Sequence, residues 1–241
     1  FQYLSSHPAV NSDRIAMSGI CTGASLSLIA ASDTRIQNQV LFVNFFAGYY
    51  DAFDVVKALG SRSRFYGETT KTWTPDKLTL RIFTKHIIEG VEDVSDKEIL
   101  TQFFIDETRS DESEPRPITK QGMAVYKILK GTTVNEIDLL IQHLSPNTIE
   151  FLKRISPKSH LKGVKTRVLI MHDTEDKLVP SDESRRLADA LKGNMYFTEF
   201  SFFQDEIQVH VDGSTQLSKW DFITEGFKLY LHMYQIFRNL E

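Results

Sequence analysis

The hydrophobic positions of this chain follow two patterns: short apolar runs near both ends and helical spacing in between. The runs have the length and composition of buried parallel strands, and they lie at 14–18, 39–46, 166–171 and 195–203. Segments with helical character separate or follow them, at 24–32, 181–191 and 220–240. Alternating strands and helices are typical of βαβ units with right-handed crossovers. The ends of the chain therefore predict an α/β fold with a parallel sheet.

The middle of the chain predicts helices and no strands. Apolar residues recur at helical spacing in 80–91, 97–104, 122–129 and 134–144, and Pro146 opens a further helix at 147–155. The acidic, Ser-rich segment 106–117 contains prolines and predicts an exposed loop. We therefore expect a core formed by 1–48 and 166–241, with a mostly helical insertion at 49–165.

The start of the chain is unusual. Residues 1–7 look like the end of a helix, and they include neither an initiator Met nor a signal peptide. We expect a truncated or processed product.

Composition narrows the class of protein. The 241 residues carry a formal net charge of −4, which gives no electrostatic reason to expect nucleic acid or an anionic membrane as a partner. No apolar run approaches the ~20 residues that span a bilayer. The single cysteine excludes an internal disulfide, and we expect a reducing, cytoplasmic compartment.

A cysteine lies at the centre of the predicted turn between the first strand and the first helix. The turn is Gly19-Ile20-Cys21-Thr22-Gly23. This is the G-x-S-x-G pattern of a nucleophile elbow with Cys in place of Ser, in which we expect both glycines to be required by a turn too tight for side chains. A helix N-terminus behind the thiol would stabilise a thiolate. The alternative is a buried structural cysteine.

Two later segments supply possible partners for Cys21. The strand at 166–171 ends in a turn that contains Asp173, Glu175 and Asp176, and Ser181 can cap the helix that follows. His210 follows the last strand and could act as a general base and then as a general acid. A solvated acidic turn and an exposed loop histidine are the alternatives. The order nucleophile, acid, histidine, each after a strand, favours the catalytic interpretation.

A metal site is a further alternative at the same turn, because His172 lies beside Asp173 and Asp176. The spacing matches no standard ligand motif. We therefore expect neither a metal nor another cofactor.

At these residues the chain resembles the α/β-hydrolase superfamily. Segment 13–23 looks like the family's fifth strand and elbow, and segment 169–180 is similar to its strand-seven segment, in which the last Asp before Val-Pro is the triad acid. The resemblance implies that Asp176 is the acid and His210 the triad histidine. The cysteine elbow resembles that of dienelactone hydrolases, which use a Cys-His-Asp triad. The insertion lies where the family places a helical cap.

The resemblance implies a hydrolase that cleaves an ester, thioester or lactone of a small acyl substrate through a covalent acyl-enzyme. The Thr22 N–H would bind the oxyanion, and Asp51 is a rival for the triad acid. The resemblance also implies that the family's N-terminal strands, and with them a second oxyanion donor, are absent from this chain. Strand 14–18 would then present an unpaired edge, to which a partner or the missing N-terminal segment could bind. Four cap phenylalanines could line an apolar substrate site, although we expect most to be cap core: Phe65, Phe83, Phe103 and Phe104. The alternative function is a non-catalytic, hydrolase-like binding protein or subunit. As a partner, a second copy of the chain could form a dimer with it.

Overall fold

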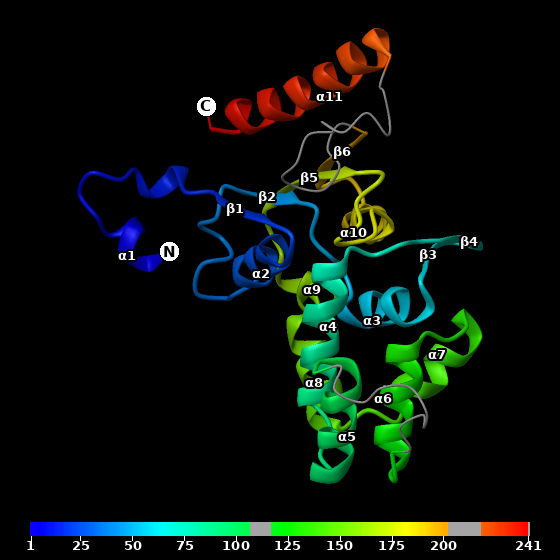
Figure 1. Ribbon diagram of the computed structural model, residues 1–241. Coiled ribbons are helices and arrows are strands. Elements are labelled where there is room, and N and C mark those ends of the chain that lie inside the picture. The colour runs from blue at the N-terminus through cyan, green and yellow to red at the C-terminus, as the bar shows by residue number, and fades with distance from the viewer. Residues whose placement is uncertain (107–116, 202–217, 241) are drawn as a thin grey trace. The chain divides into compact units, whose positions relative to one another are not determined.

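The computed structural model describes residues 1–106, 117–201 and 218–240 (Figure 1). Contacts divide the chain into two compact units. The first joins the segments Phe1–Ala52 and Ile155–Glu241, and the second is Phe53–Arg154. The first unit holds the parallel sheet, and the second is mostly helical.

The predicted parallel sheet is confirmed. Its four strands are parallel and lie in the order β1-β2-β5-β6. Their bounds are β1 Met17–Ile20, β2 Phe42–Phe46, β5 Arg167–Asp173 and β6 Met195–Phe200. All but the first residue of β5 are buried, which explains why this strand reads as a continuous apolar run.

Helices cover the sheet on both faces. Side chains alternate across a strand, so Val43 and Phe45 of β2 face one side while Asn44 faces the other. Helices α2 and α10 pack on the Val43 side through a shared core that includes Leu28 and Leu187, and α11 packs on the Asn44 side. The helices of this unit are α1 Gln2–Ser5, α2 Thr22–Ala31, α9 Pro157–His160, α10 Asp182–Leu191 and α11 Lys219–Arg238, with short 3-10 turns at Ser12–Arg14 and Leu161–Gly163.

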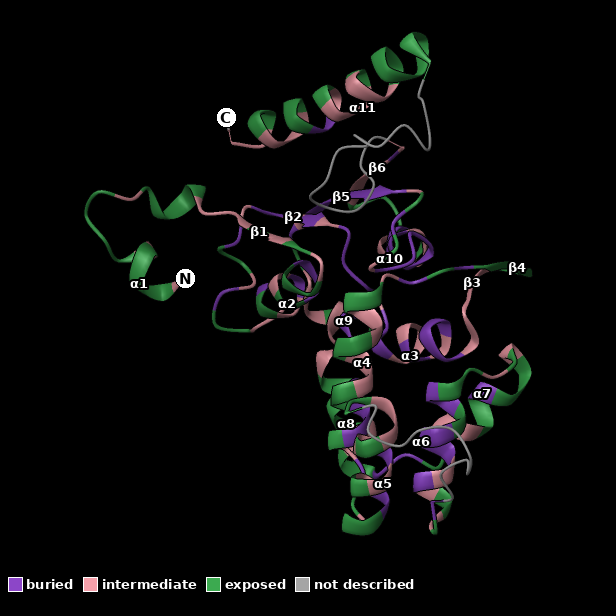
Figure 2. Ribbon diagram, in the orientation of Figure 1, coloured by how far each residue is buried: buried purple, intermediate pink, exposed green. Residues whose placement is uncertain are grey.

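The first strand differs from its prediction. The Asn11 side chain accepts a hydrogen bond from the Asp13 N–H and starts a 3-10 turn over Ser12–Arg14, so the strand begins later, at Met17. Within the described residues β1 pairs with β2 alone and forms one end of the sheet. Ile20, at its end, is half exposed, whereas β2 and β5 are mostly buried (Figure 2).

The second unit contains a β-hairpin that the sequence analysis missed, since it predicted no strands there. Strands β3 (Ser63–Tyr66) and β4 (Thr69–Thr72) are antiparallel. The two-residue turn between them starts at Gly67, whose φ of 56° is a conformation that glycine adopts without strain. Every residue of β4 is exposed, so no apolar run marks this strand.

The helical prediction for the second unit is otherwise confirmed. Its helices are α3 Ala52–Ser61, α4 Lys77–Glu89, α5 Val94–Phe104, α6 Lys120–Lys130, α7 Val134–Ile141 and α8 Pro146–Ile155, of which α3 starts at the boundary between the units. Side-chain caps fix several starts, because Asp76, Asp93, Thr119 and Thr133 each accept a hydrogen bond from a first-turn N–H.

The four cap phenylalanines are partly buried within this unit. Phe65 and Phe83 lie against a small core formed by Ala58, Leu59 and Trp73, and the rings of Phe103 and Phe104 contact the ring of Tyr126. None of the four is fully buried, and Phe104 also lines a groove along α4 and α5, so these residues lie at the margin of the core. Among the residues that the structure describes, no helix is long and apolar enough to cross a bilayer.

Candidate active site

Cys21 occupies a strained turn between β1 and α2. Its φ of 54° and ψ of −130° lie in a region that side-chain-bearing residues rarely adopt. The Cys21 N–H donates to the Phe46 carbonyl at 2.9 Å, which ties the turn to the end of β2. The thiol is half-buried and not part of a disulfide. This is the backbone geometry of a nucleophile elbow, in which a sharp turn exposes a side chain above the sheet.

Only one of the two glycines in this turn is required by close packing. A Cβ on Gly19 would lie 2.2 Å from the Gly23 carbonyl oxygen, whereas a Cβ on Gly23 would meet nothing within 4 Å. The prediction that both positions exclude side chains is therefore correct for Gly19 and wrong for Gly23. The helix begins at Thr22, so its N–H belongs to the first turn, where backbone N–H groups lack an acceptor within the helix.

The loop after β2 is fastened to the helix that follows Cys21. The Ser25 hydroxyl donates to the Tyr49 carbonyl at 2.8 Å and accepts from the Tyr49 N–H at 2.9 Å. The pKa of Tyr49 is raised to about 12, chiefly by burial and to a smaller extent by the charges of Cys21 and Glu183. The Tyr49 phenol thus lies within electrostatic range of the Cys21 thiol, a neighbour that the sequence analysis did not identify.

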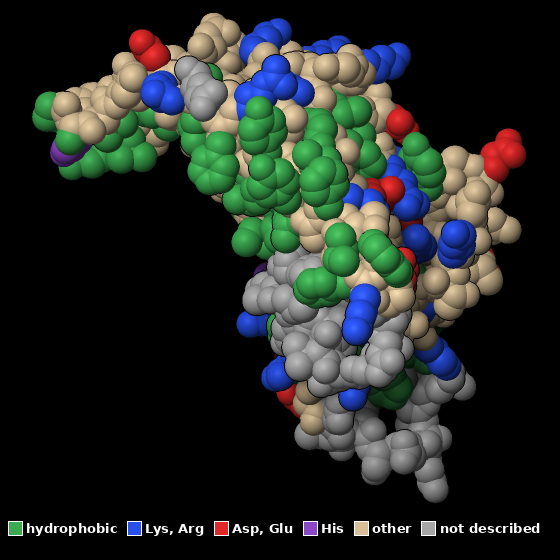
Figure 3. Space-filling view, turned by 90° about the horizontal axis from the view of Figure 1, so that it is seen from above, with side chains coloured by type: hydrophobic (Ala, Val, Ile, Leu, Met, Phe, Trp, Pro, Cys, Tyr) green, Lys and Arg blue, Asp and Glu red, His purple; other side chains and the backbone are tan. Residues whose placement is uncertain are grey.

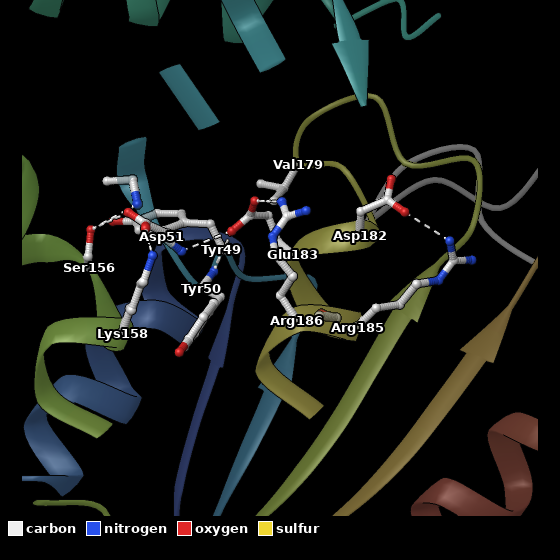
Figure 4. Close-up of polar contacts among 12 residues, drawn as sticks. Tyr49, Tyr50, Asp51, Ser156, Lys158, Val179, Asp182, Glu183, Arg185 and Arg186 are labelled. Carbon is white, nitrogen blue, oxygen red and sulfur yellow. Dashed lines mark hydrogen bonds and ion pairs between the residues drawn. The ribbon is translucent and has the colours of Figure 1, made fainter. Parts of the chain in front are cut away.

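Glu183 anchors the same loop from the other side (Figure 4). Its carboxylate is fully buried and accepts the N–H groups of Tyr50 and Asp51, both at 2.9 Å. The other carboxylate oxygen is paired with Arg186 one turn along α10. A buried charge of this kind needs such partners, so Glu183 fixes where α10 meets the end of β2.

The start of α10 corrects one expectation. Ser181 is the residue before the helix, but its side chain makes no capping hydrogen bond. Its backbone is already helical, with φ −59° and ψ −20°, whereas a capping residue is typically extended. The acidic first turn of this helix was visible in the sequence as a helix-dipole effect. Its role in holding the loop after β2 was not, because the partners lie more than 130 residues away.

Asp176 lies in the turn after β5 and is buried. One carboxylate oxygen accepts the N–H groups of Leu178 (2.6 Å) and Val179 (3.0 Å). The other lies 3.2 Å from Nε2 of His172. The candidate acid is thus engaged with its own turn, and this interaction with a buried histidine on β5 was not anticipated.

His172 and Asp173 have local partners rather than the arrangement of a metal site. Nδ1 of His172 lies 2.7 Å from the Ser184 hydroxyl, and Nε2 lies 3.1 Å from the Val179 carbonyl. The Asp173 carboxylate accepts the Glu175 N–H at 2.8 Å. Within the described part of the chain, no group of three or more His, Cys, Asp or Glu residues could hold a metal ion.

Asp51, the rival acid, follows β2 and is also buried. Its carboxylate accepts Lys158 Nζ at 2.8 Å and the Ser156 hydroxyl at 3.3 Å. Figure 4 shows these partners converging on it. The structure therefore places Cys21 and both candidate acids after neighbouring parallel strands. His210 lies outside the described residues, so its distance from Cys21 stays a prediction.

The described surface of each unit contains a hollow. A groove of 1020 Å³ follows α4 and α5 in the second unit. A second hollow of 660 Å³ lies at the opposite edge of the sheet, where β2 and β5 begin, beside Lys165 and Arg167. Cys21 is among the lining residues of neither one, so their shapes say nothing about its substrate.

Comparison with known proteins gives fold-level similarities only. No family model matches the chain, and no curated protein matches it. Its structure is similar to an α/β fold family hydrolase from Bacillus anthracis str. Sterne, with 15% identity, a TM-score of 0.41, and 91% of this chain and 66% of that chain covered. It is also similar to a meta-cleavage product hydrolase from Pseudomonas fluorescens IP01, with 14% identity and a TM-score of 0.37. That match covers 92% of this chain and 65% of that chain.

The complex of DcsB with its substrate analogue gives 16% identity, a TM-score of 0.41, and coverage of 97% of this chain and 69% of that chain. This chain thus spans about two thirds of the length of these three proteins. At such low identities and TM-scores, the similarities say nothing about its substrate or mechanism.

Proposed function

We propose that this protein is a hydrolase of the α/β-hydrolase type that cleaves a small ester, thioester or lactone through an acyl-enzyme on Cys21. The observation that carries the proposal is the conformation of Cys21, with φ at 54° between a parallel strand and a helix. Such strain is costly, about 1–3 kcal/mol, and persists where surrounding structure enforces it, often at active sites. Two features hold the strained turn here: the close approach of Gly19 to the Gly23 backbone, and the hydrogen bond from the Cys21 N–H to the Phe46 carbonyl.

Each step of the proposed reaction uses a group of this chain. His210 takes the thiol proton, and the N-terminal end of α2 stabilises the thiolate. The Cys21 sulfur attacks the carbonyl carbon, and the Thr22 N–H stabilises the oxyanion. The tetrahedral intermediate collapses to a thioester on Cys21, and the alcohol or thiol leaves with the proton from His210. Water, activated by the same histidine, then releases the acid.

The acid of the triad is proposed to be Asp176, with Asp51 as its rival. Both are buried and both follow strands of the sheet. The Asp51 carboxylate is paired with the cationic Lys158, whereas the Asp176 carboxylate has backbone N–H groups and a histidine as neighbours. A bound lysine competes with an imidazolium for the carboxylate, so the pairing of Asp51 with Lys158 disfavours Asp51 as the triad acid.

The test is hydrolysis of p-nitrophenyl acetate and an acetyl thioester by the wild type and five variants. We expect Cys21→Ala and His210→Ala to reduce kcat/KM to the background rate. Asp176→Asn should reduce it more than Asp51→Asn does, with Glu175→Gln as the exposed, matched acidic control. Equal activity of wild type and Cys21→Ala would refute the proposal, and a larger effect of Asp51→Asn would exchange the two acids.

The second candidate is a non-catalytic binding protein or subunit. It is favoured by the local engagement of Asp176, whose carboxylate already has partners within its own turn. This candidate predicts that alkylation of Cys21 by iodoacetamide has the rate of an ordinary thiol and the same rate in His210→Ala. Rapid alkylation near neutral pH that slows in His210→Ala would contradict it.

A further inference from the structure

The long helix α11 has two faces of different character. On the side facing the sheet, His232 is fully buried. Its Nδ1 lies 3.0 Å from the Thr198 hydroxyl on β6, and its Nε2 lies 3.0 Å from Oδ1 of Asn44 on β2. These two contacts fix which face of α11 packs on the sheet and which face is left outside.

The outside face carries a row of large apolar residues, which we call the outer seam. Each of them is at least half exposed. Figure 3, a view from above relative to Figure 1, shows hydrophobic side chains gathered on the upper surface of the molecule. The outer seam consists of Trp220 (78% exposed), Ile223 (59%), Phe227 (57%), Tyr230 (62%), Tyr234 (50%) and Phe237 (61%). Monomeric proteins rarely leave so large an apolar patch in water, so a patch of this size marks a binding surface.

The spacing of the outer seam is that of a helix–helix interface. Its members alternate steps of three and four residues from 220 to 237, which is the a/d repeat of a coiled coil. His232 falls at the position opposite this repeat, in agreement with its burial against the sheet. The residues flanking the middle of the seam are uncharged: Thr224, Gly226, Leu231 and Met233. Depletion of charge is characteristic of the centre of a protein interface.

The area of the outer seam is close to what a dimer requires. An aromatic side chain buries about 150–250 Å², so six side chains at these exposures offer roughly 700 Å². A standard interface buries about 800 Å² on each partner. A two-fold interface uses the same patch twice, which requires the patch to complement itself.

The geometry points to a second copy of this chain as the occupant, and we propose that two α11 helices pair along their outer seams in antiparallel orientation. The seam is centred between Phe227 and Tyr230, whose rings stack at 6.1 Å within one chain. In the antiparallel pair Phe227 faces Tyr230 of the second copy, and Ile223 faces Tyr234. Opposed helix dipoles favour this direction over the parallel one. The pairing does not depend on catalysis by Cys21.

The charges of α11 disfavour a lipid surface as the occupant. Interfacial helices are rich in Lys and Arg on the polar face, which meets lipid headgroups. In α11 the three basic residues exceed the acidic ones by only one, because Asp221 and Glu225 are also present, and Lys228 is paired with Glu225 at 2.7 Å. The face opposite the outer seam is packed on the sheet rather than open to headgroups.

The first experiment measures the mass of the full chain in solution by light scattering over a range of concentrations. We expect the mass of two chains at tens of micromolar. Phe227→Glu should weaken the dimer at least about a hundredfold, since it buries a charge on each copy. The matched control Leu139→Glu, on an equally exposed residue of α7, should remain dimeric. A monomeric wild type, or a dimer unaffected by Phe227→Glu, would overturn the proposal. So would a monomer that binds anionic vesicles through α11.

The second experiment tests orientation in a Cys21→Ser background. Chains with Ile223→Cys are mixed with chains with Tyr234→Cys and oxidised. Antiparallel pairing predicts a disulfide-linked heterodimer, because positions 223 and 234 face each other. Homodimers of each variant without the heterodimer would contradict the antiparallel arrangement. Circular dichroism checks that each variant keeps the fold.

Discussion

At the scale of single residues, the local sequence predicts the nucleophile elbow. The roles of the residues around the elbow depend on long-range contacts. The Gly-x-Cys-x-Gly spacing is contained within five residues, so the turn around Cys21 could be predicted. The role of Glu183 could not, because it depends on a loop more than 130 residues away. The same is true of Tyr49, whose raised pKa reflects burial that no local pattern encodes.

The two glycines of the elbow provide a matched pair of variants. We expect Gly19→Ala to lower the free energy of unfolding by roughly 2–4 kcal/mol, because the new Cβ would clash with backbone atoms. Gly23→Ala should leave stability unchanged or raise it by up to about 1 kcal/mol, because its site is open and alanine favours the helix. Urea unfolding measures both. Equal changes in the free energy of unfolding would contradict the close approach of Gly19 to the Gly23 backbone.

Burial of Glu183 leads to a second prediction at this scale. Glu183→Gln removes the charge that Arg186 neutralises and weakens the acceptor for the Tyr50 and Asp51 N–H groups. Breaking a buried pair from one side costs about 3–5 kcal/mol, and we expect a loss of this size in urea unfolding. Glu175→Gln, on an exposed residue, should change stability by less than about 0.5 kcal/mol. Comparable losses in the two variants would argue against the anchoring role of Glu183.

At the scale of elements, the sequence predicts those with a clear apolar pattern. The four parallel strands and the longer helices were found from apolar runs and helical spacing. The β3–β4 hairpin was missed because β4 is polar and exposed, so no hydrophobic face marks it. The capping function of Ser181 was predicted wrongly, since side-chain caps depend on backbone angles that residue type alone does not determine.

The attachment of α11 to the sheet predicts a pH dependence. Burial lowers the pKa of His232 to about 4, below its ordinary value of 6.5. Because the pKa of His232 is lower in the folded chain than in the unfolded chain, protonation favours the unfolded chain. The full free energy of unfolding is therefore present above pH 6.5, and part of it is lost as the pH falls towards 4. The free energy of unfolding falls by up to about 3 kcal/mol, because each unit of pKa difference corresponds to about 1.4 kcal/mol.

Unfolding of wild type and His232→Gln at pH 7 and pH 4.5 measures this effect. The wild type should lose more stability on acidification than the variant does, because glutamine does not titrate. Identical pH dependence in the two proteins would show that the protonation of His232 does not control how α11 is held.

At the scale of the whole molecule, the parallel α/β class was predicted from the alternation of strands and helices. The boundaries of the insertion were predicted at 49 and 165, and contacts place the second unit at Phe53–Arg154. Helical periodicity identifies such a region but does not show which residues at its ends pack with the first unit instead. The triad rests on His210, which lies outside the described residues, so its assembly stays a prediction.

Pairing through α11 has a consequence for the stability of the whole protein. Because association stabilises only the folded chain, Tm should rise with protein concentration in the wild type. Phe227→Glu should remove this dependence, and Leu139→Glu should preserve it. Calorimetry over a hundredfold range of concentration measures the effect, and a constant Tm in the wild type would contradict pairing.

The most direct measurement of the central claim is the mass of the protein after brief reaction with p-nitrophenyl butyrate and an acid quench. Acylation needs only the nucleophile, its base and an oxyanion donor, so it is detectable even where turnover is slow. The account predicts one butyryl group on Cys21, located by peptide mass spectrometry, absent in Cys21→Ala and strongly reduced in His210→Ala. An unmodified Cys21, or labelling at the same rate in His210→Ala, would contradict it.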